Sequence, residues 1–313
     1  MKKILKIKGD ASFRKFYRKK NNNYTSVLVF AKKEKFTNLL VYDAINKILN
    51  KNKILAPKLY KENYNKNYIE IQDFGNETIF KKLNQKRINK FIYFKKIINL
   101  LNKTQSIKNR KIKNFKNKYY TIPKYDKSLI IKEASLFCDW YAKKKLTRSS
   151  KDKFSREFQK IIKRLAHNLK LKNNIFVHRD FHVSNMMLVK GRIGVIDSQD
   201  ALIGNKAYDL ASLIDDVRFK TSKLLKSKVY KFYINKQNKL NKNQFKKDFE
   251  ILSILRNLKI IGIFTRLAIR DNKKNYLKMI PYAWTLIDMR INENKIFMDL
   301  KVLLKENFRG KIK

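Results

Sequence analysis

A short strand-like segment, residues 175–197, interrupts a stretch of chain whose pattern is otherwise helical. The segment holds an apolar run, a polar loop, and two further apolar runs at 186–189 and 193–196 around Lys190-Gly191-Arg192. Two apolar runs joined by a short glycine-containing turn predict a β-hairpin. The polar loop is therefore expected to lie between a strand and a hairpin, and the hairpin returns its last residue, Asp197, beside the loop.

The N-terminal quarter has a different pattern. Residues 13–17, 24–31, 59–60 and 68–71 are rich in aromatic and β-branched residues and predict strands, while apolar residues at helical spacing predict a helix over 36–50. Gln72-Asp73-Phe74-Gly75 then breaks the pattern with a turn. We interpret residues 1–75 as a small strand-rich lobe ending in a hinge, and residues 76–313 as a second, mostly helical lobe.

Composition excludes several classes of protein. One cysteine and three histidines leave no disulfide framework and no cysteine- or histidine-rich metal site. No apolar run reaches the ~18–20 residues that span a bilayer, so we expect a soluble, cytoplasmic monomer. The net charge of +51 suggests a polyanion partner, but the lysines are spread over the whole chain. Lys, Asn and Ile share A/T-rich codons, so genome bias explains the charge and we expect no specific nucleic-acid partner.

The polar loop carries the chemistry. His178, Asp180 and Asn185 form the pattern HxDxxxxN, and Asp197 follows across the hairpin. Phosphoryl transfer from ATP needs a carboxylate that orients the acceptor hydroxyl, and oxygen ligands for Mg²⁺ on the phosphates. Asp180 fits the catalytic role, and Asn185 and Asp197 fit the metal role. A plain surface loop would not explain why an aspartate ends the last apolar strand.

These residues also carry a family resemblance. Residues 178–185 (HRDFHVSN) and 196–200 (IDSQD) resemble the catalytic and metal-binding loops of the aminoglycoside phosphotransferase and choline kinase-like family. Segments 9–14 (GDASFR), 72–75 (QDFG), 208–213 (YDLASL) and 256–270, with the pair at 140–141, resemble more narrowly the bacterial anomeric kinases of N-acetylmuramate and N-acetylglucosamine. The markers cover nearly the whole chain.

The resemblance implies an α+β, protein-kinase-like bilobal fold, with a small β-rich N-lobe and a larger, mostly helical C-lobe. It implies a kinase that uses ATP and Mg²⁺ to phosphorylate the anomeric hydroxyl of an N-acetylated amino sugar in cell-wall recycling. It also implies that Gly9, Asp10, Ala11 and Ser12 lie over the ATP phosphates, that Gln72 and Phe74 lie at the adenine, and that Asp209 gives structural support. From their own chemistry, Trp140 is a candidate to stack on the sugar and His178 to pack within the loop, and Asp200 is a further candidate near the sugar.

Three positions depart from the family pattern. The interior of the strand at 27–31 lacks the lysine that contacts the α- and β-phosphates in this fold. Lys32, Lys33 and Lys35 follow the strand, and the sequence does not choose among them. Ser198 stands where phenylalanine usually follows the metal aspartate, and we expect it to weaken a packing contact. Three lysines, 143–145, make the substrate side more basic than the resemblance implies.

Two alternatives stay open. One is a kinase of another small hydroxylated metabolite, of the choline, ethanolamine, homoserine or aminoglycoside type. The other is a non-catalytic, polyanion-binding pseudokinase, which the missing strand lysine would permit. A cationic acceptor needs a locally acidic pocket, and 25 acidic against 76 basic residues favour a neutral or anionic acceptor.

Overall fold

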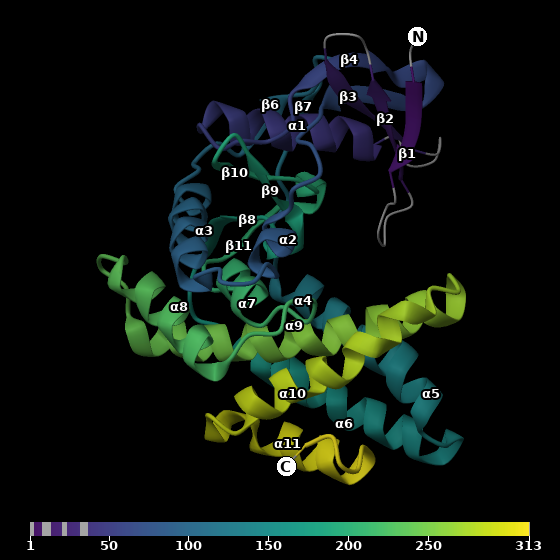
Figure 1. The fold of residues 1–313 in the computed structure, drawn as a ribbon. Helices are drawn as coiled ribbons and strands as arrows, with labels where there is room; N and C mark the ends of the chain where they lie inside the picture. Colours follow the sequence, from purple (N-terminus) through teal and green to yellow (C-terminus); the bar gives the residue numbers. More distant parts are fainter. Residues whose placement is uncertain (1–2, 8–13, 21–23, 32–36, 313) are drawn as a thin grey trace. The chain divides into compact units, whose positions relative to one another are not determined.

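The computed structural model describes residues 3–7, 14–20, 24–31 and 37–312 (Figure 1). The chain forms two compact units, and each unit is built from two separate segments. The first unit is 1–123 with 175–203, and the second is 124–174 with 204–313. The predicted lobes, 1–75 and 76–313, were divided where the sequence pattern changes from strands to helices. The compact units are defined by contacts instead, so the predicted division stays a prediction.

The first unit contains an antiparallel sheet of five strands in the order β1-β2-β3-β5-β4. Four of its strands overlap the segments that aromatic and β-branched residues predicted, and β1 precedes them. The strands are β1 (Lys3–Ile7), β2 (Lys15–Lys20), β3 (Thr25–Phe30), β4 (Leu59–Asn63) and β5 (Tyr68–Gln72).

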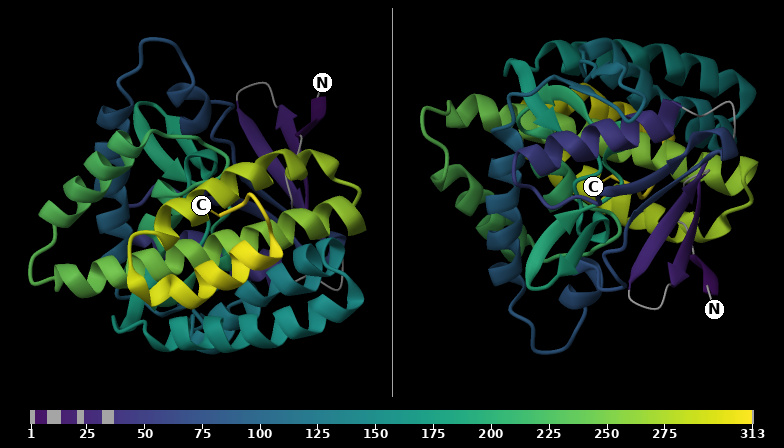
Figure 2. Two further views of the ribbon diagram at one scale, coloured as in Figure 1. Left: turned by 90° about the horizontal axis from the view of Figure 1, so that it is seen from below. Right: turned by 90° about the horizontal axis from the view of Figure 1, so that it is seen from above.

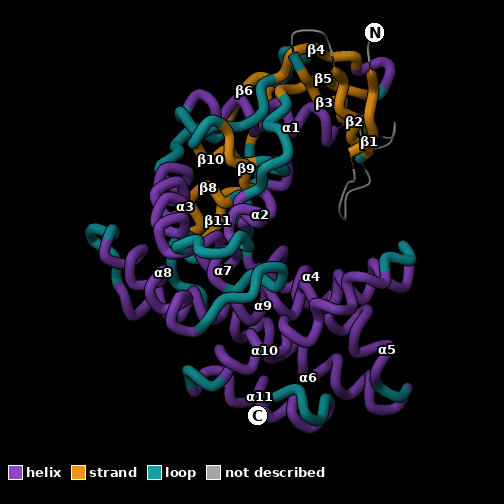
Figure 3. Tube along the Cα trace, in the orientation of Figure 1, coloured by secondary structure: helices purple, strands orange, loops and turns teal. Residues whose placement is uncertain are grey.

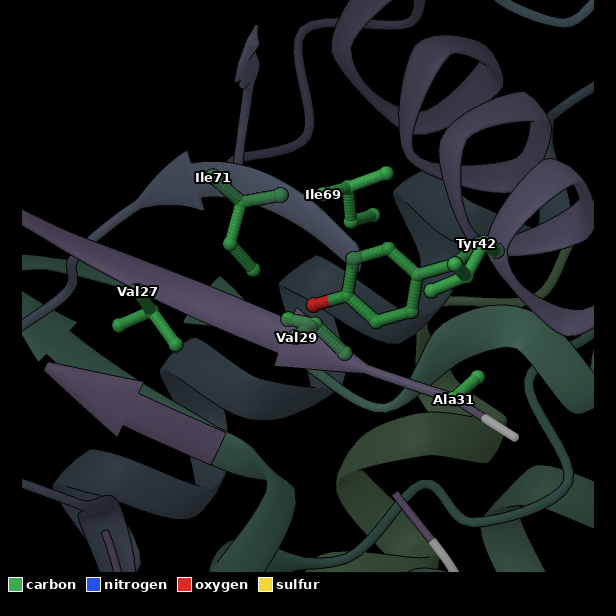
Figure 4. Packing of buried hydrophobic residues seen from close by; sticks show 7 residues of the cluster. Val27, Val29, Ala31, Tyr42, Ile69 and Ile71 are labelled. Carbon is green, nitrogen blue, oxygen red and sulfur yellow. The ribbon is translucent and has the colours of Figure 1, made fainter. Parts of the chain in front are cut away.

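One helix, α1 (Thr37–Lys51), covers one face of this sheet. Val27 pairs with Ile71 and Val29 with Ile69 across β3 and β5, so their side chains share that face. The Tyr42 ring of α1 lies over them and completes the buried cluster (Figure 4). The apolar face of α1 thus fixes the helix against the sheet.

The rest of the first unit consists of short elements (Figure 3). Strand β8 pairs with β11, while β9–β10 and β6–β7 are hairpins. The β9–β10 hairpin confirms the pattern at 186–196, and its turn residues Lys190 and Gly191 both have positive φ. The elements are α2 (Ile79–Leu83), α3 (Lys90–Gln105), β6 (Lys111–Lys113), β7 (Tyr119–Thr121), β8 (Asn173–Val177), β9 (Met186–Val189), β10 (Arg192–Val195) and β11 (Leu202–Asn205).

The β6–β7 hairpin lies where the sequence showed only a lysine-rich run. The Asn114 side chain accepts hydrogen bonds from two backbone N–H groups of the turn, and Asn117 adopts φ 56°. The Tyr119 ring lies beneath the ammonium groups of Lys111 and Lys113. The signal was therefore turn chemistry at asparagine, which the charge bias of the sequence concealed.

The second unit is helical, apart from the ends of β8 and β11. Its longest helix, α9, is buried along most of its length and runs beside α10 (Figure 2). None of the described helices has the length and apolar character that a membrane crossing requires. The helices are α4 (Lys127–Leu136), α5 (Lys143–Lys145), α6 (Arg148–His167), α7 (Tyr208–Ile214), α8 (Lys223–Asn235), α9 (Lys242–Arg270), α10 (Ile280–Ile291) and α11 (Met298–Asn307).

The crossing of α4 and α9 depends on one glycine. A Cβ atom at Gly262 would lie 2.3 Å from the backbone carbonyl atoms of Leu136. Directly after Leu136 the helix changes to a π-helical turn, Phe137–Ala142, which carries Trp140. The close approach of two backbones at this point requires glycine on α9.

Gly262→Ala is therefore expected to destabilise the protein by about 1–3 kcal/mol, because the added methyl forces the two backbones apart. Helix propensity alone would give the opposite sign, a gain of about 1 kcal/mol. Urea unfolding followed by circular dichroism separates the two effects. A variant more stable than the wild type would contradict the packing described for this crossing.

Candidate active site

The loop predicted to be catalytic follows β8 directly and folds back on itself. The backbone carbonyl of Asp180 accepts hydrogen bonds from the His182 N–H at 3.0 Å and from the Asn185 side-chain amide at 3.2 Å. Arg179, just before Asp180, has φ 72°, a left-handed conformation that is uncommon outside glycine. This turn fixes the positions of Asp180 and Asn185 relative to one another.

The β9–β10 hairpin returns Asp197 to this loop, as the sequence predicted. The Ile196 N–H donates to the Asn185 carbonyl at 3.0 Å, so Asp197 follows immediately after a residue bonded to the loop. Asp197 itself has φ 62°, and its side chain is 38% exposed. Asp180, Asn185 and Asp197 are therefore brought together within the first unit.

The hairpin is fixed on both edges by backbone hydrogen bonds. Val195 donates to the Leu55 carbonyl at 2.8 Å, in the segment after α1. Leu188 donates to the Glu77 carbonyl at 2.8 Å, in the segment after β5. The position of Asp197 thus depends on the two connections that leave α1 and the sheet.

The turn predicted as the hinge packs against the same hairpin. Phe74 is buried, and a Cβ atom at Gly194 in β10 would lie 2.8 Å from its ring. The turn is closed by Asp73, whose carboxylate accepts hydrogen bonds from Arg18 and from the Gly75 N–H. Burial alone would raise the pKa of Asp73, but these hydrogen bonds outweigh it and lower the pKa.

An arginine that the sequence reasoning did not select reaches the predicted metal carboxylate. Arg14 is 6% exposed, and its guanidinium donates to Asp197 Oδ1 at 2.7 Å and to Gln199 Oε1 at 2.8 Å. The guanidinium carbon lies 5.7 Å from the centroids of the Phe16 and Tyr42 rings. The available signal was its place at the end of the GDASFR segment.

Ser198 connects the metal loop to α1. The weakened packing contact expected at this serine stays a prediction, and the structure shows a polar contact that was not predicted. Ser198 is fully buried and donates to Asn46 Oδ1 at 2.6 Å. Tyr42, one turn earlier on α1, has its pKa raised to about 12, chiefly by burial; Arg14 lowers it and Asp197 raises it.

The donor set fits a magnesium ion. Asp197 supplies a partly exposed carboxylate, and Asn185 uses its amide nitrogen on the Asp180 carbonyl, which leaves the amide oxygen as a ligand. Within the described ranges, no three His, Cys, Asp or Glu side chains gather as a metal cluster. Mg²⁺ typically uses one or two protein carboxylates together with substrate phosphates, so a sparse oxygen set suits it.

The remaining predicted residues have various locations. His178 is buried, and burial lowers its pKa although Asp180 and Asp197 act the other way, so a packing role is consistent. Asp200 is exposed and accepts a hydrogen bond from Gln199 at 2.8 Å.

Trp140, which is half-buried, and Asp209, which is buried, belong to the second unit, and their predicted roles stay predictions. Residues Gly9, Asp10, Ala11 and Ser12 lie outside the described residues, as do Lys32, Lys33 and Lys35.

Comparison with known proteins identifies the family. Residues 3–226 match the model of the phosphotransferase enzyme family, so the chain belongs to that family. The chain is 27% identical to the N-acetylmuramate/N-acetylglucosamine kinase of Neisseria meningitidis, over 87% of this chain and 81% of that protein. It is 24% identical to the Pseudomonas putida protein of the same name, over 95% of this chain and 86% of that one.

Solved structures confirm the predicted α+β, protein-kinase-like fold. An ethanolamine kinase from Plasmodium vivax matches with a TM-score of 0.64 at 16% identity, over 91% of this chain and 81% of that one. An ADP-bound aminoglycoside phosphotransferase matches with a TM-score of 0.59 at 16% identity, over 91% and 94%. At this identity the likeness describes the fold alone.

Ser198→Ala is expected to lower the free energy of unfolding by about 1–3 kcal/mol, because the buried Asn46 oxygen loses its donor. Thr285→Ala is the matched control, since this hydroxyl is exposed on α10, and its effect is expected to stay within about 0.5 kcal/mol. Chemical denaturation measures both. Equal stability of Ser198→Ala and the wild type would contradict the contact.

The lowered pKa of His178 predicts a pH dependence of stability. As the pH falls below the unfolded-state value of ~6.5, the unfolded chain takes up a proton that the native imidazole does not. The unfolding free energy of the wild type should then fall by at most about 1.4 kcal/mol per pH unit from this group.

The test compares denaturation between pH 7.5 and 5.5 in the wild type and in His178→Asn, with His167→Asn at an exposed position as the control. The slope of the His178→Asn variant should be shallower than that of the wild type. An unchanged slope would contradict the lowered pKa.

Proposed function

We propose that the chain is an ATP-dependent sugar kinase that transfers phosphate to the anomeric hydroxyl of an N-acetylated amino sugar. The product is a sugar 1-phosphate, in keeping with a role in cell-wall recycling. One observation carries the proposal: Asp180, Asn185 and Asp197 lie together on hydrogen-bonded loops, in a chain whose relatives are named N-acetylmuramate/N-acetylglucosamine kinases. A monomeric state and a cytoplasmic location belong to the proposal.

In this proposal Asp180 acts on the acceptor. Its carboxylate accepts the proton of the anomeric hydroxyl and orients the oxygen for attack on the γ-phosphate. The backbone of the loop is fixed by the hydrogen bonds that the Asp180 carbonyl accepts, so little reorientation is needed when the sugar binds. Buried His178 serves as support, and its lowered pKa suits a neutral ring.

Asn185 and Asp197 would hold Mg²⁺, which when bound neutralises charge on the phosphates. The segment from Glu70 to Phe74 would hydrogen-bond the adenine through its backbone, and residues 9–12 would cover the phosphates. The pinned hairpin supports this assignment, because it holds Asp197 and the Phe74 ring in fixed positions. Asp209, Trp140 and Asp200 complete the proposed set, the first as support and the others at the sugar.

The acceptor is neutral or anionic in this proposal. A chain with 76 basic and 25 acidic residues has few carboxylates with which to line a pocket for a polycation. N-acetylmuramate, which carries a carboxylate, fits this charge better than an aminoglycoside or choline. The fold neighbours include an ethanolamine kinase, so amino alcohols belong in any acceptor screen.

The purified protein with ATP and Mg²⁺ is expected to convert N-acetylmuramate or N-acetylglucosamine to its 1-phosphate. The measurement is ³¹P NMR of the products from a panel that also holds choline, ethanolamine, homoserine and kanamycin. Turnover of only the amino alcohols or kanamycin would refute the substrate assignment. ATP binding without turnover of any acceptor would support a pseudokinase instead.

Asp180→Asn should lower kcat by about 10²–10⁴-fold, because the amide accepts no proton. The dissociation constant for ADP should stay close to that of the wild type. Asp152→Asn is the matched control, since this side chain is 66% exposed on α6, and it should keep full activity. An Asp180→Asn variant with wild-type kcat would refute the catalytic role.

A further inference from the structure

The strand expected to supply a phosphate-binding lysine cannot do so within its described residues. Strand β3 (Thr25–Phe30) reads TSVLVF and contains no lysine. Its face toward α1 is occupied by Val27 and Val29, which pack beneath the Tyr42 ring (Figure 4). In protein kinases a lysine of the third strand contacts the α- and β-phosphates. Lys32, Lys33 and Lys35, which follow the strand, lie outside the described residues. Among the described residues, the phosphate-binding cation has to come from another element.

Arg14 contacts the carboxylate that is predicted to bind the metal. Its Nη2 atom is 2.7 Å from Oδ1 of Asp197, the residue that the motif assigns to the metal. Its Nη1 atom is 2.8 Å from Oε1 of Gln199, which is itself buried. Asp197 would hold Mg²⁺ at the nucleotide phosphates, so a cation at this carboxylate would be within reach of the same phosphates. With Asp197 in its proposed metal role, Arg14 lies next to the place where the nucleotide phosphates would bind.

The burial of Arg14 indicates more than a surface ion pair. A charged side chain that is only 6% exposed is costly unless partners fix it, and Arg14 has a carboxylate, an amide oxygen and two aromatic rings. The planar guanidinium suits this arrangement, because it directs donors at two acceptors at once and lies against aromatic rings. Such a fork also matches the oxygens of a phosphate.

We propose that Arg14, directly before β2, replaces the missing strand lysine: it binds the phosphates of the nucleotide and positions Asp197 for the metal. This inference rests on the proposed use of ATP. Before nucleotide binds, Asp197 neutralises the arginine, and the pair keeps both groups in place. When Mg²⁺ and nucleotide bind, the guanidinium holds the phosphates beside the same carboxylate.

The test measures binding rather than turnover. Isothermal titration calorimetry gives three dissociation constants for the wild type and for Arg14→Met. Adenosine and ADP are each measured with EDTA present, and ADP is measured again with Mg²⁺. We expect Arg14→Met to bind metal-free ADP about tenfold or more weakly, because a charge-assisted bond to phosphate is lost. Adenosine, which has no phosphate, should bind within about twofold of the wild type.

Two variants keep the result interpretable. Lys15→Met removes the same charge from the neighbouring, exposed position and should bind ADP as the wild type does. Arg14→Lys keeps the charge but loses the fork, so it should show the same selective loss of ADP affinity to a smaller degree. It also provides the test if Arg14→Met fails to fold.

Three outcomes would overturn the inference. Unchanged ADP affinity in Arg14→Met would exclude contact with the phosphates. Equal weakening of ADP and adenosine would assign Arg14 a purely structural role. A wild-type protein that binds no ADP with or without Mg²⁺ would refute the proposed function and this inference with it, whereas the first two outcomes leave the proposed function standing.

Discussion

The candidate site depends on the backbone hydrogen bonds that fix the β9–β10 hairpin on both of its edges. Val195 is bonded to the segment after α1, and Leu188 is bonded to the segment after the hinge turn. Gly194 is a glycine because Phe74 and the Leu55 carbonyl approach it too closely for a side chain. These contacts leave little freedom at the end of the hairpin, where the chain turns into Asp197 with a left-handed backbone.

A second layer of contacts joins this turn to α1 and the sheet. Ser198 bonds Asn46 of α1, and Arg14 of the segment entering β2 reaches Asp197 and Gln199. Tyr42 lies between the sheet core and the Arg14 guanidinium. Helix α1, the sheet and the predicted metal carboxylate are therefore joined by one continuous set of contacts, which includes Arg14.

The sequence predicted most of the regular structure because the apolar periodicities were long or sharply bounded. Strand β3 follows from its β-branched and aromatic residues, helix α1 from helical spacing, and the β9–β10 hairpin from a glycine turn. The β6–β7 hairpin did not, because its signal lay in two asparagines within a lysine-rich run. Short connections of this kind depend on turn geometry, which periodicity does not detect.

The site was partly predictable for a similar reason. HxDxxxxN and the distant aspartate have fixed spacing, so the loop chemistry could be inferred from local sequence. The GDASFR segment drew attention to the position of Arg14, but its partner could not be chosen, because Asp197 is 183 residues away along the chain. Ser198 was interpreted from the phenylalanine that usually occupies its position in the family. Its observed contact is with Asn46 of α1, which the local sequence does not reveal. Long-range polar pairs require the fold before they can be assigned.

The central claim is that Asp197 and Asn185 form a metal site that operates with a nucleotide. Electron paramagnetic resonance of Mn²⁺ titrated into the protein with ADP measures this as the loss of free-ion signal beyond that caused by the same concentration of ADP alone. We expect about one tightly bound Mn²⁺ per wild-type chain in the presence of ADP, and weak binding in Asp197→Asn and in Asn185→Ala. Equal Mn²⁺ binding by the wild type and both variants would contradict it.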